Sequence, residues 1–390
     1  MKPIMKKKAK NRLVSAAMTS LLYTTFMVAT TQAEDFKPEV LTVEKTIAAG
    51  PNVFVEWSGW DAASKIHIYS QADLSYKGFI SSGLTSQFIT SHDGKTLYLL
   101  STYMKRFTTG PIESVLEIYD ISTLTKIKEV VLSGKAAMSI AMNGLLEHSS
   151  DDKYVYVQNA TPATSVSVVD VASGTVLTEV PTPGCYGIIP ATSGYKFSTL
   201  CGSGQIKTVA LKGTEYTLTA SEKIFDVDSD ALFIHSERRG NGDLIFTSFN
   251  GNLYLVSDKD EKVKLKEKIA VSADIEGNWA PGGYSITAYN KPNDMVFMIM
   301  HPDAEEGSHK DASTEIWAYS LKQKKLLSRS AAEGLIALDA TQDKIPKLFG
   351  SNENDESVDM FAPTKGTKFD YEKTGSDARV LWTTALMVSK

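Results

Sequence analysis

The sequence is poor in the residues on which many catalytic and metal sites depend. It has only two cysteines among 390 residues, which excludes a disulfide-rich scaffold or a four-cysteine zinc site. The cysteines stand sixteen residues apart without a CxxC motif, so they are also a poor redox site. The GxSxG, HExxH, P-loop and GxGxxG motifs are absent. No common hydrolase, metalloprotease or nucleotide-binding enzyme is therefore indicated.

Histidine is also scarce, and its spacing does not suggest a metal site. The six histidines do not fall at the helical spacing of metal ligands; they are His67, His92, His148, His235, His301 and His309. Acid-rich turns at 148–152 and 226–230 offer oxygen ligands for calcium, but solvated turns have the same composition. We therefore expect no metal site.

Long apolar runs are missing except at the N-terminus. A basic stretch, Lys2 to Arg12, precedes a mostly apolar stretch, Leu13 to Ala29, and Thr31-Gln32-Ala33 offers a small-x-small cleavage site. This order is typical of a secretory signal peptide, and the apolar run is shorter than the roughly 18 to 20 residues of a membrane span. We predict a signal peptide at 1–33 and an exported domain at 34–390. In an exported chain the two cysteines are expected to pair, the alternative being two buried thiols.

Basic residues are outnumbered once the predicted signal peptide is removed. The first 33 residues contain six basic and no acidic side chains, so the net charge changes from −5 to −11 without them. An acidic surface argues against nucleic acid or an anionic membrane as a partner.

What the chain does contain is a repeat. IHIYSQADL from Ile66, LEIYDISTL from Leu116 and VSVVDVASG from Val166 follow one another at intervals of fifty residues. Their apolar residues alternate, as in strands with one buried face. A strand-based period of about 40 to 50 residues predicts a β-propeller.

Later strand-like runs extend the pattern to the C-terminus. Hairpin signals include Asp93-Gly94 and Asn250-Gly251, and further runs lie at 293–303, 314–327, 344–363 and 378–389. Seven unit-ending strands can be counted: IHIYS, LEIYD, VSVVD, IKTVAL, LYLVS, IWAYS and VDMFA. We therefore predict an all-β, seven-bladed β-propeller in one domain, with residues from Arg379 onward closing the ring near Asn52. Two separate β domains are the alternative.

Several longer strings resemble a known family. They are VQNATPATSVSVVDVASG (157–174), GCYGIIP (184–190), NWAPGGYSITAYN (278–290), MHPDAEEGSHKDASTEIWAYS (300–320) and STYMKRFTTG (101–110). The chain is similar to the heavy chains of quinoprotein amine dehydrogenases, most of all to the heavy subunit of aromatic amine (aralkylamine) dehydrogenase. The methylamine dehydrogenase heavy chain is a more distant match. The resemblance runs from about Asn52 to Leu338.

The resemblance implies a function and partners. It implies a periplasmic heterotetramer of two heavy and two light chains that oxidises primary, arylalkyl amines, and a disulfide between Cys185 and Cys201. Its cofactor, tryptophan tryptophylquinone, is on the light chain, so no catalytic residues are expected on this chain. Electrons would pass to a small copper protein such as azurin or amicyanin.

One loop bears on substrate choice. The family places a Phe at the mouth of the substrate channel, whereas the loop here reads VEWSGWDAAS (55–64). Trp60 is the first candidate for this gate and Trp57 the second; the alternative is that both pack between blades. Two rival functions remain, a non-catalytic propeller scaffold or binding protein and a lactonase-type propeller enzyme, but no axial ring of metal ligands can be assembled from the sequence for the latter.

Overall fold

The structure is a computed structural model that describes residues 43–59, 62–107 and 109–389. Contacts divide the chain into two units, 1–44 and 45–390, and all strands belong to the second. The predicted signal peptide and Trp60 lie outside the described residues.

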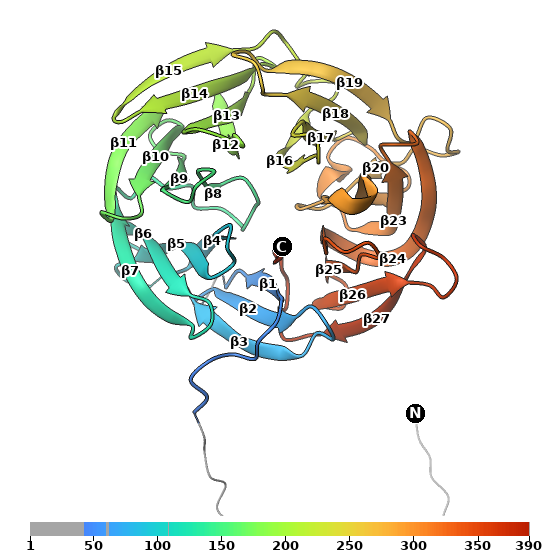
Figure 1. The fold of residues 1–390 in the computed structure, drawn as a ribbon, viewed down its shortest axis with the longest axis horizontal. Helices are drawn as coiled ribbons and strands as arrows, with labels where there is room; N and C mark the ends of the chain where they lie inside the picture. The colour runs from blue at the N-terminus through green and yellow to red at the C-terminus, as the bar shows by residue number, and fades with distance from the viewer. Residues whose placement is uncertain (1–42, 60–61, 108, 390) are drawn as a thin grey trace, which may run out of the picture. The chain divides into compact units, whose positions relative to one another are not determined.

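Five antiparallel sheets have four strands each, and within residues 45–390 the sheets follow one another around a ring (Figure 1). From the middle of the ring outward, the first three sheets are β28 (Ala385–Val388), β1 (Asn52–Trp57), β2 (Lys65–Ser70), β3 (Tyr76–Ser81); β4 (Thr85–Thr90), β5 (Thr96–Met104), β6 (Ile112–Asp120), β7 (Thr125–Leu132); and β8 (Leu146–His148), β9 (Tyr154–Asn159), β10 (Ser165–Asp170), β11 (Thr175–Pro181). The next two are β12 (Cys185–Pro190), β13 (Lys196–Cys201), β14 (Ile206–Lys212), β15 (Glu215–Ala220); and β16 (Leu232–Arg238), β17 (Leu244–Ser248), β18 (Asn252–Ser257), β19 (Lys264–Ala270).

The sixth sheet has eight strands. They are β20 (Ala280–Pro281), β21 (Thr287–Asn290), β22 (Met295–His301), β23 (Ser313–Ser320), β24 (Lys325–Ala340), β25 (Leu348–Asn352), β26 (Ser357–Pro363) and β27 (Tyr371–Asp377). Two short 3₁₀ turns, η1 (Lys291–Asn293) and η2 (Ser308–Lys310), flank β22. The strand β24 is sixteen residues long and joins the two halves of this sheet, since it pairs with β23 through its first part and with β25 through its last.

The prediction of seven blades is therefore wrong. The all-β propeller architecture is confirmed, but the structure has five four-stranded blades and one continuous eight-stranded sheet. The seven unit-ending strands are all present, as β2, β6, β10, β14, β18, β23 and β26. The count failed because β23 and β26 share one sheet, where β24 runs on without the turn that would separate two blades.

Edge and interior strands differ in composition as their positions require. The outer strand β19 reads KLKEKIA and is mostly exposed, and its lysines discourage pairing with another chain. In contrast β22, with the sequence MVFMIMH, is buried along its whole length. The core consists of layers between neighbouring sheets; in one of them Leu100 and Leu116 pack with Val155 and Val157 of the next sheet.

The two ends of the folded chain meet in one sheet. Val53 pairs with Val388, and the Ser389 amide donates to the Asn52 carbonyl at 2.9 Å. The predicted closure of the ring by the C-terminal residues near Asn52 is confirmed. Leu386 and Val388 are buried there, in the same apolar cluster as Val53.

Candidate functional site

The strand order gives the ring two distinct ends. Turns between the first and second strands of neighbouring sheets touch one another, so they share one end, here called the turn end. The printed contacts are His92 to Asp152, Asp151 to Tyr195, Pro190 to Arg238, Arg239 to Asp294, and Asn293 to Lys344. Because the strands alternate in direction, the loops between second and third strands lie at the opposite end, here called the loop end.

The loop end gathers the segments that carried the family resemblance. The connections 58–64, 105–111, 160–164 and 302–312 follow the second strands β1, β5, β9 and β22. The strings that begin at 101, 157 and 300 therefore reach into this end, although they are far apart in the sequence. A hollow of about 690 Å³ lies beside 105–111, and the side chains of Phe107, Ile112 and Val131 around it are 42 to 61% exposed.

Trp57 lies at the loop end, where β1 enters the 58–64 connection. Its side chain is half-buried, and the Lys65 Nζ sits 5.0 Å from the centre of its ring. The same ammonium group is 5.4 Å from the ring of Phe79, which is itself exposed. The two aromatic side chains and Lys65 thus form an accessible apolar corner with one cation.

Glu56 lies next to Trp57 on the buried face of β1. Its carboxylate accepts hydrogen bonds from Ser58 Oγ at 3.0 Å and from Ser86 Oγ of β4 at 2.9 Å. Burial raises the pKa of Glu56 to about 8, against the lowering effect of the two hydroxyl bonds. The group is therefore a neutral acid near pH 7 that bridges two sheets. The sequence gave no sign of it, because its burial depends on a strand thirty residues away.

The two cysteines form the expected disulfide. Cys185 opens β12, Cys201 ends β13, and the two residues stand opposite each other in the sheet with a Cα–Cα distance of 3.9 Å. The bond lies at the loop end, since it closes the strand ends opposite the 191–195 turn. It ties the entry of one blade to its second strand.

A set of ionisable groups faces the middle of the ring from strands that are distant in sequence. His235 and Glu237 of β16 are joined by a bond of 3.2 Å between Nε2 and Oε1. Burial lowers the pKa of His235, but Glu237, Asp339 and Glu147 outweigh it, so the pKa is raised. Burial and then the charge of Glu237 raise the pKa of Asp339 to about 7. The arrangement suits storage of a proton, and sequence reasoning missed it because β8, β16 and β24 meet only when the ring closes.

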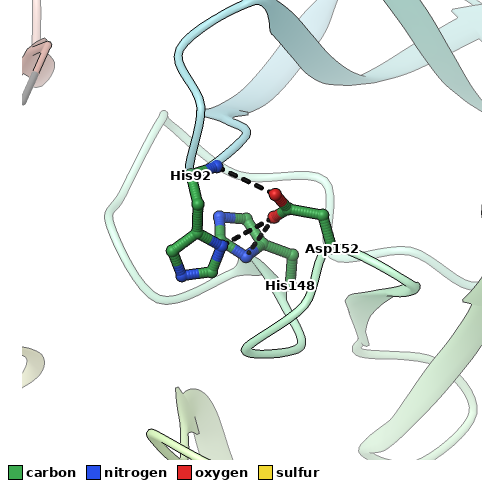
Figure 2. A group of neighbouring side chains, drawn as sticks. All are labelled: His92, His148 and Asp152. Atoms are coloured by element: carbon green, nitrogen blue, oxygen red, sulfur yellow. Dashed lines mark hydrogen bonds and ion pairs between the residues drawn. The ribbon is translucent and has the colours of Figure 1, made fainter.

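At the turn end the structure brings together two histidines and an aspartate. Figure 2 shows both imidazole rings facing the carboxylate of Asp152, with His92 from the turn after β4 and His148 at the end of β8. Asp152 Oδ1 lies 2.8 Å from His92 Nδ1 and 3.0 Å from His148 Nδ1. The two rings meet edge to face with centroids 4.3 Å apart. Among the described residues this is the one group of three or more His, Cys, Asp or Glu side chains placed to share a metal ion.

The acid-rich turn at 226–230, the other predicted candidate, is occupied by internal contacts. Asp226 accepts from the amides of Asp228 and Ser229. Asp230 bonds Lys268 and Tyr254. The expectation of ordinary turn chemistry fits these contacts.

Comparison with known proteins gives a consistent result. The sequence model of the methylamine dehydrogenase heavy chain family matches residues 54–384. The methylamine dehydrogenase heavy chain of Methylobacillus flagellatus is 23% identical over 295 residues, which are 74% of this chain and 73% of the relative. That of Methylorubrum extorquens is 23% identical over 297 residues, covering 74% and 71%.

Solved structures show the same architecture at low sequence identity. A putative 6-phosphogluconolactonase from Bacteroides fragilis aligns with a TM-score of 0.62 and 12% identity over 90% of this chain and 100% of the other, a likeness of fold alone. Within the described part of the chain, no helix has the length and apolar character to span a membrane. With a family match over most of its length, the chain belongs to the methylamine dehydrogenase heavy chain family.

Proposed function

We propose that this protein is the heavy subunit of a periplasmic amine dehydrogenase that converts primary, arylalkyl amines to aldehyde and ammonia. The observation that carries the proposal is the family match over residues 54–384. In this proposal the partner is a light subunit, in a complex of two heavy and two light chains, and a small copper protein accepts the electrons. The signal peptide predicted at 1–33 would direct the protein to the periplasm.

The described residues do not fit a tryptophan-derived quinone on this chain, which supports its assignment to the light subunit. Trp279 and Trp317 are the nearest pair of indoles, with ring centroids 5.3 Å apart. Trp317 is fully buried, and its Nε1 donates to Glu315 at 2.7 Å. An amine could not reach a quinone there. The bound cofactor would accept two electrons from the amine.

The heavy chain's own contribution would be positioning and exclusion of water. We propose that the light subunit docks on the loop end, where exposed apolar side chains border the 690 Å³ hollow and where the family-like segments gather. Trp57 and Trp60, on the connection between β1 and β2, would then line the substrate entrance. Covering this surface would remove water from the reacting groups.

Purification of the complex tests the proposal. We expect the native protein to copurify with a small cysteine-rich subunit, to show a quinone absorption band, and to reduce a dye in the presence of phenylethylamine. A colourless, inactive protein without a second subunit would contradict the proposal and favour a non-catalytic propeller scaffold. Activity with methylamine but not with phenylethylamine would retain the heavy-subunit role and overturn the arylalkyl assignment.

A further inference from the structure

We propose that His92, His148 and Asp152 form a binding site for a divalent transition-metal ion, with Zn²⁺ as the principal candidate, at the junction between the β4–β7 and β8–β11 sheets. The site lies at the turn end, away from Trp57 and the loop end. It does not depend on the amine dehydrogenase proposal.

The three donor atoms already converge. The ligand atoms of the group all lie within 4.8 Å of one another, and both His Nδ1 atoms approach the same oxygen, Asp152 Oδ1. Metal–ligand bonds of 2.0 to 2.1 Å place tetrahedral ligand atoms about 3.3 Å apart. The present separations of 2.8 and 3.0 Å would therefore need to open by only a few tenths of an ångström. Two imidazoles and a carboxylate suit Zn²⁺ or Cu²⁺ and leave a position for water.

The orientation of His148 favours a metal ligand. Its Nε2 faces the Thr90 carbonyl at 3.0 Å, so that nitrogen carries the proton of a neutral ring. Its Nδ1 then presents a lone pair to two further acceptors, the Ser149 carbonyl at 3.1 Å and Asp152 Oδ1 at 3.0 Å. Burial lowers the pKa of His148, which disfavours a second proton on the ring. A bound cation resolves this opposition of acceptors.

The carboxylate is oriented by groups outside the donor set. Asp152 Oδ2 accepts from the His92 backbone amide at 3.0 Å, which directs Oδ1 toward the two rings. Asp152 also occupies a left-handed position, with φ of 57°, where the corresponding turns of the neighbouring sheets have Gly94 and Gly194. A side chain is thus present at a position that favours glycine.

A second junction shows how such an aspartate is paired elsewhere. Asp294, also left-handed with φ of 51°, receives two hydrogen bonds from the Arg239 guanidinium of the preceding turn, at 2.9 and 2.6 Å. That junction has a permanent cation. Among the described residues, Asp152 has no ion pair with Lys or Arg, and its partners are two imidazoles. A metal ion would supply the missing charge, and the exposed side of His92 would let it enter.

The test is metal binding by the full chain without an affinity tag. After chelation and dialysis, Zn²⁺ is titrated by calorimetry, and Cu²⁺ is used as a spectroscopic probe by electron paramagnetic resonance. We expect one equivalent of Zn²⁺ to bind and to raise the melting temperature, and Cu²⁺ to show coupling to two nitrogens. His92→Asn keeps a donor where Nδ1 stands, so the hydrogen-bonded apo structure should persist. His309→Ala, which removes a histidine stacked on Phe249 outside the cluster, is the matched control.

The variants separate a metal site from a merely structural contact. His92→Asn and Asp152→Asn should each weaken Zn²⁺ binding by at least about tenfold, remove the thermal shift, and leave Cu²⁺ with altered nitrogen coupling, whereas His309→Ala should bind as the wild type does. The proposal is overturned if no saturable Zn²⁺ binding occurs. It is also overturned if both cluster variants, with the apo melting temperature of the wild type, retain full affinity.

Discussion

At the scale of single residues, Glu56 shows how burial sets the charge of a group. The carboxyl is fully buried between β1 and β4 and has a pKa of about 8, against 4.5 when free. Between these two pH values the folded state holds one proton more than the unfolded state. Stability from this group therefore falls as pH rises from 4.5 to 8, by about 1.4 kcal/mol per pH unit, and is constant above.

The Glu56→Gln variant should lose this pH dependence. Gln is close in shape and can keep the contacts with Ser58 and Ser86 while it cannot ionise. In urea unfolding at pH 5, 7 and 9, the stability of the variant relative to wild type should increase by a few kcal/mol with rising pH. Glu372→Gln, on an exposed side chain, is the control and should show a constant difference. A difference for Glu56→Gln that stays flat with pH would place a charged carboxylate at this position.

The two tryptophans of the 55–64 segment can be tested by substrate preference, if the proposed function holds. An aromatic wall stabilises an aromatic substrate by about 0.5 to 1.5 kcal/mol beyond its buried area. Trp60→Ala and Trp57→Ala should therefore raise KM for phenylethylamine relative to methylamine by roughly 2- to 10-fold. Tyr216→Ala, on the outer strand β15, should leave the ratio unchanged. A Trp60→Ala enzyme with the wild-type ratio would remove Trp60 from the substrate channel.

At the scale of elements, β24 decides how the last two structural units are joined. Residues 325–331 pair with β23 and residues 335–340 pair with β25, and Gly334 lies between them with φ of +85°. A Cβ at Gly334 would lie 2.4 Å from Asn352 Oδ1. That oxygen is held in place by the backbone amides of Asn354 and Asp355.

Gly334→Ala should consequently destabilise the protein more than a glycine substitution that meets only backbone strain. Gly366 has φ of +89° and open space around its Cβ position, so Gly366→Ala should cost about 1 kcal/mol. Gly334→Ala adds a clash with a fixed side chain and should cost at least about 2 kcal/mol, measured from urea unfolding curves. Equal losses in the two variants would mean that Asn352 moves aside freely.

The same strand marks where local sequence patterns stop being informative. Alternation and turn signals predicted the positions of β2, β6, β10 and their later equivalents, because each strand has its own buried face. They assigned no strand to 328–343, where Gly334 is the only residue typical of a turn and the backbone passes through it without reversing. Separate blades were expected there because the sequence does not show which neighbouring strand each half will pair with.

At the scale of the whole molecule, ring closure should dominate stability. Leu386 of β28 is fully buried between β1 and its apolar neighbours. Leu386→Ala should cost about 2 to 5 kcal/mol. Ile345→Ala, on a side chain that is 64% exposed, should change stability by less than about 0.5 kcal/mol. The two variants are compared by thermal and urea unfolding, and a Leu386→Ala protein as stable as Ile345→Ala would mean that the ring does not need its last strand.

Closure of the ring also explains why the candidate sites were only partly foreseen. The disulfide and the 55–64 segment could be identified because they are local in sequence or part of a family pattern. His92 and His148 are 56 positions apart, and His235 and Asp339 are more than a hundred. Their proximity depends on how sheets stand beside one another, which no spacing along the chain encodes.

The pairing of β28 with β1 also fixes the order of events during biosynthesis. The first blade lacks its inner strand until residues 385–388 have been made, more than 300 residues after β1. The ring therefore cannot be completed during synthesis, and the chain leaves the ribosome with β1 still missing one neighbour. Its final folding step is post-translational, and it joins the oldest folded segment to the newest.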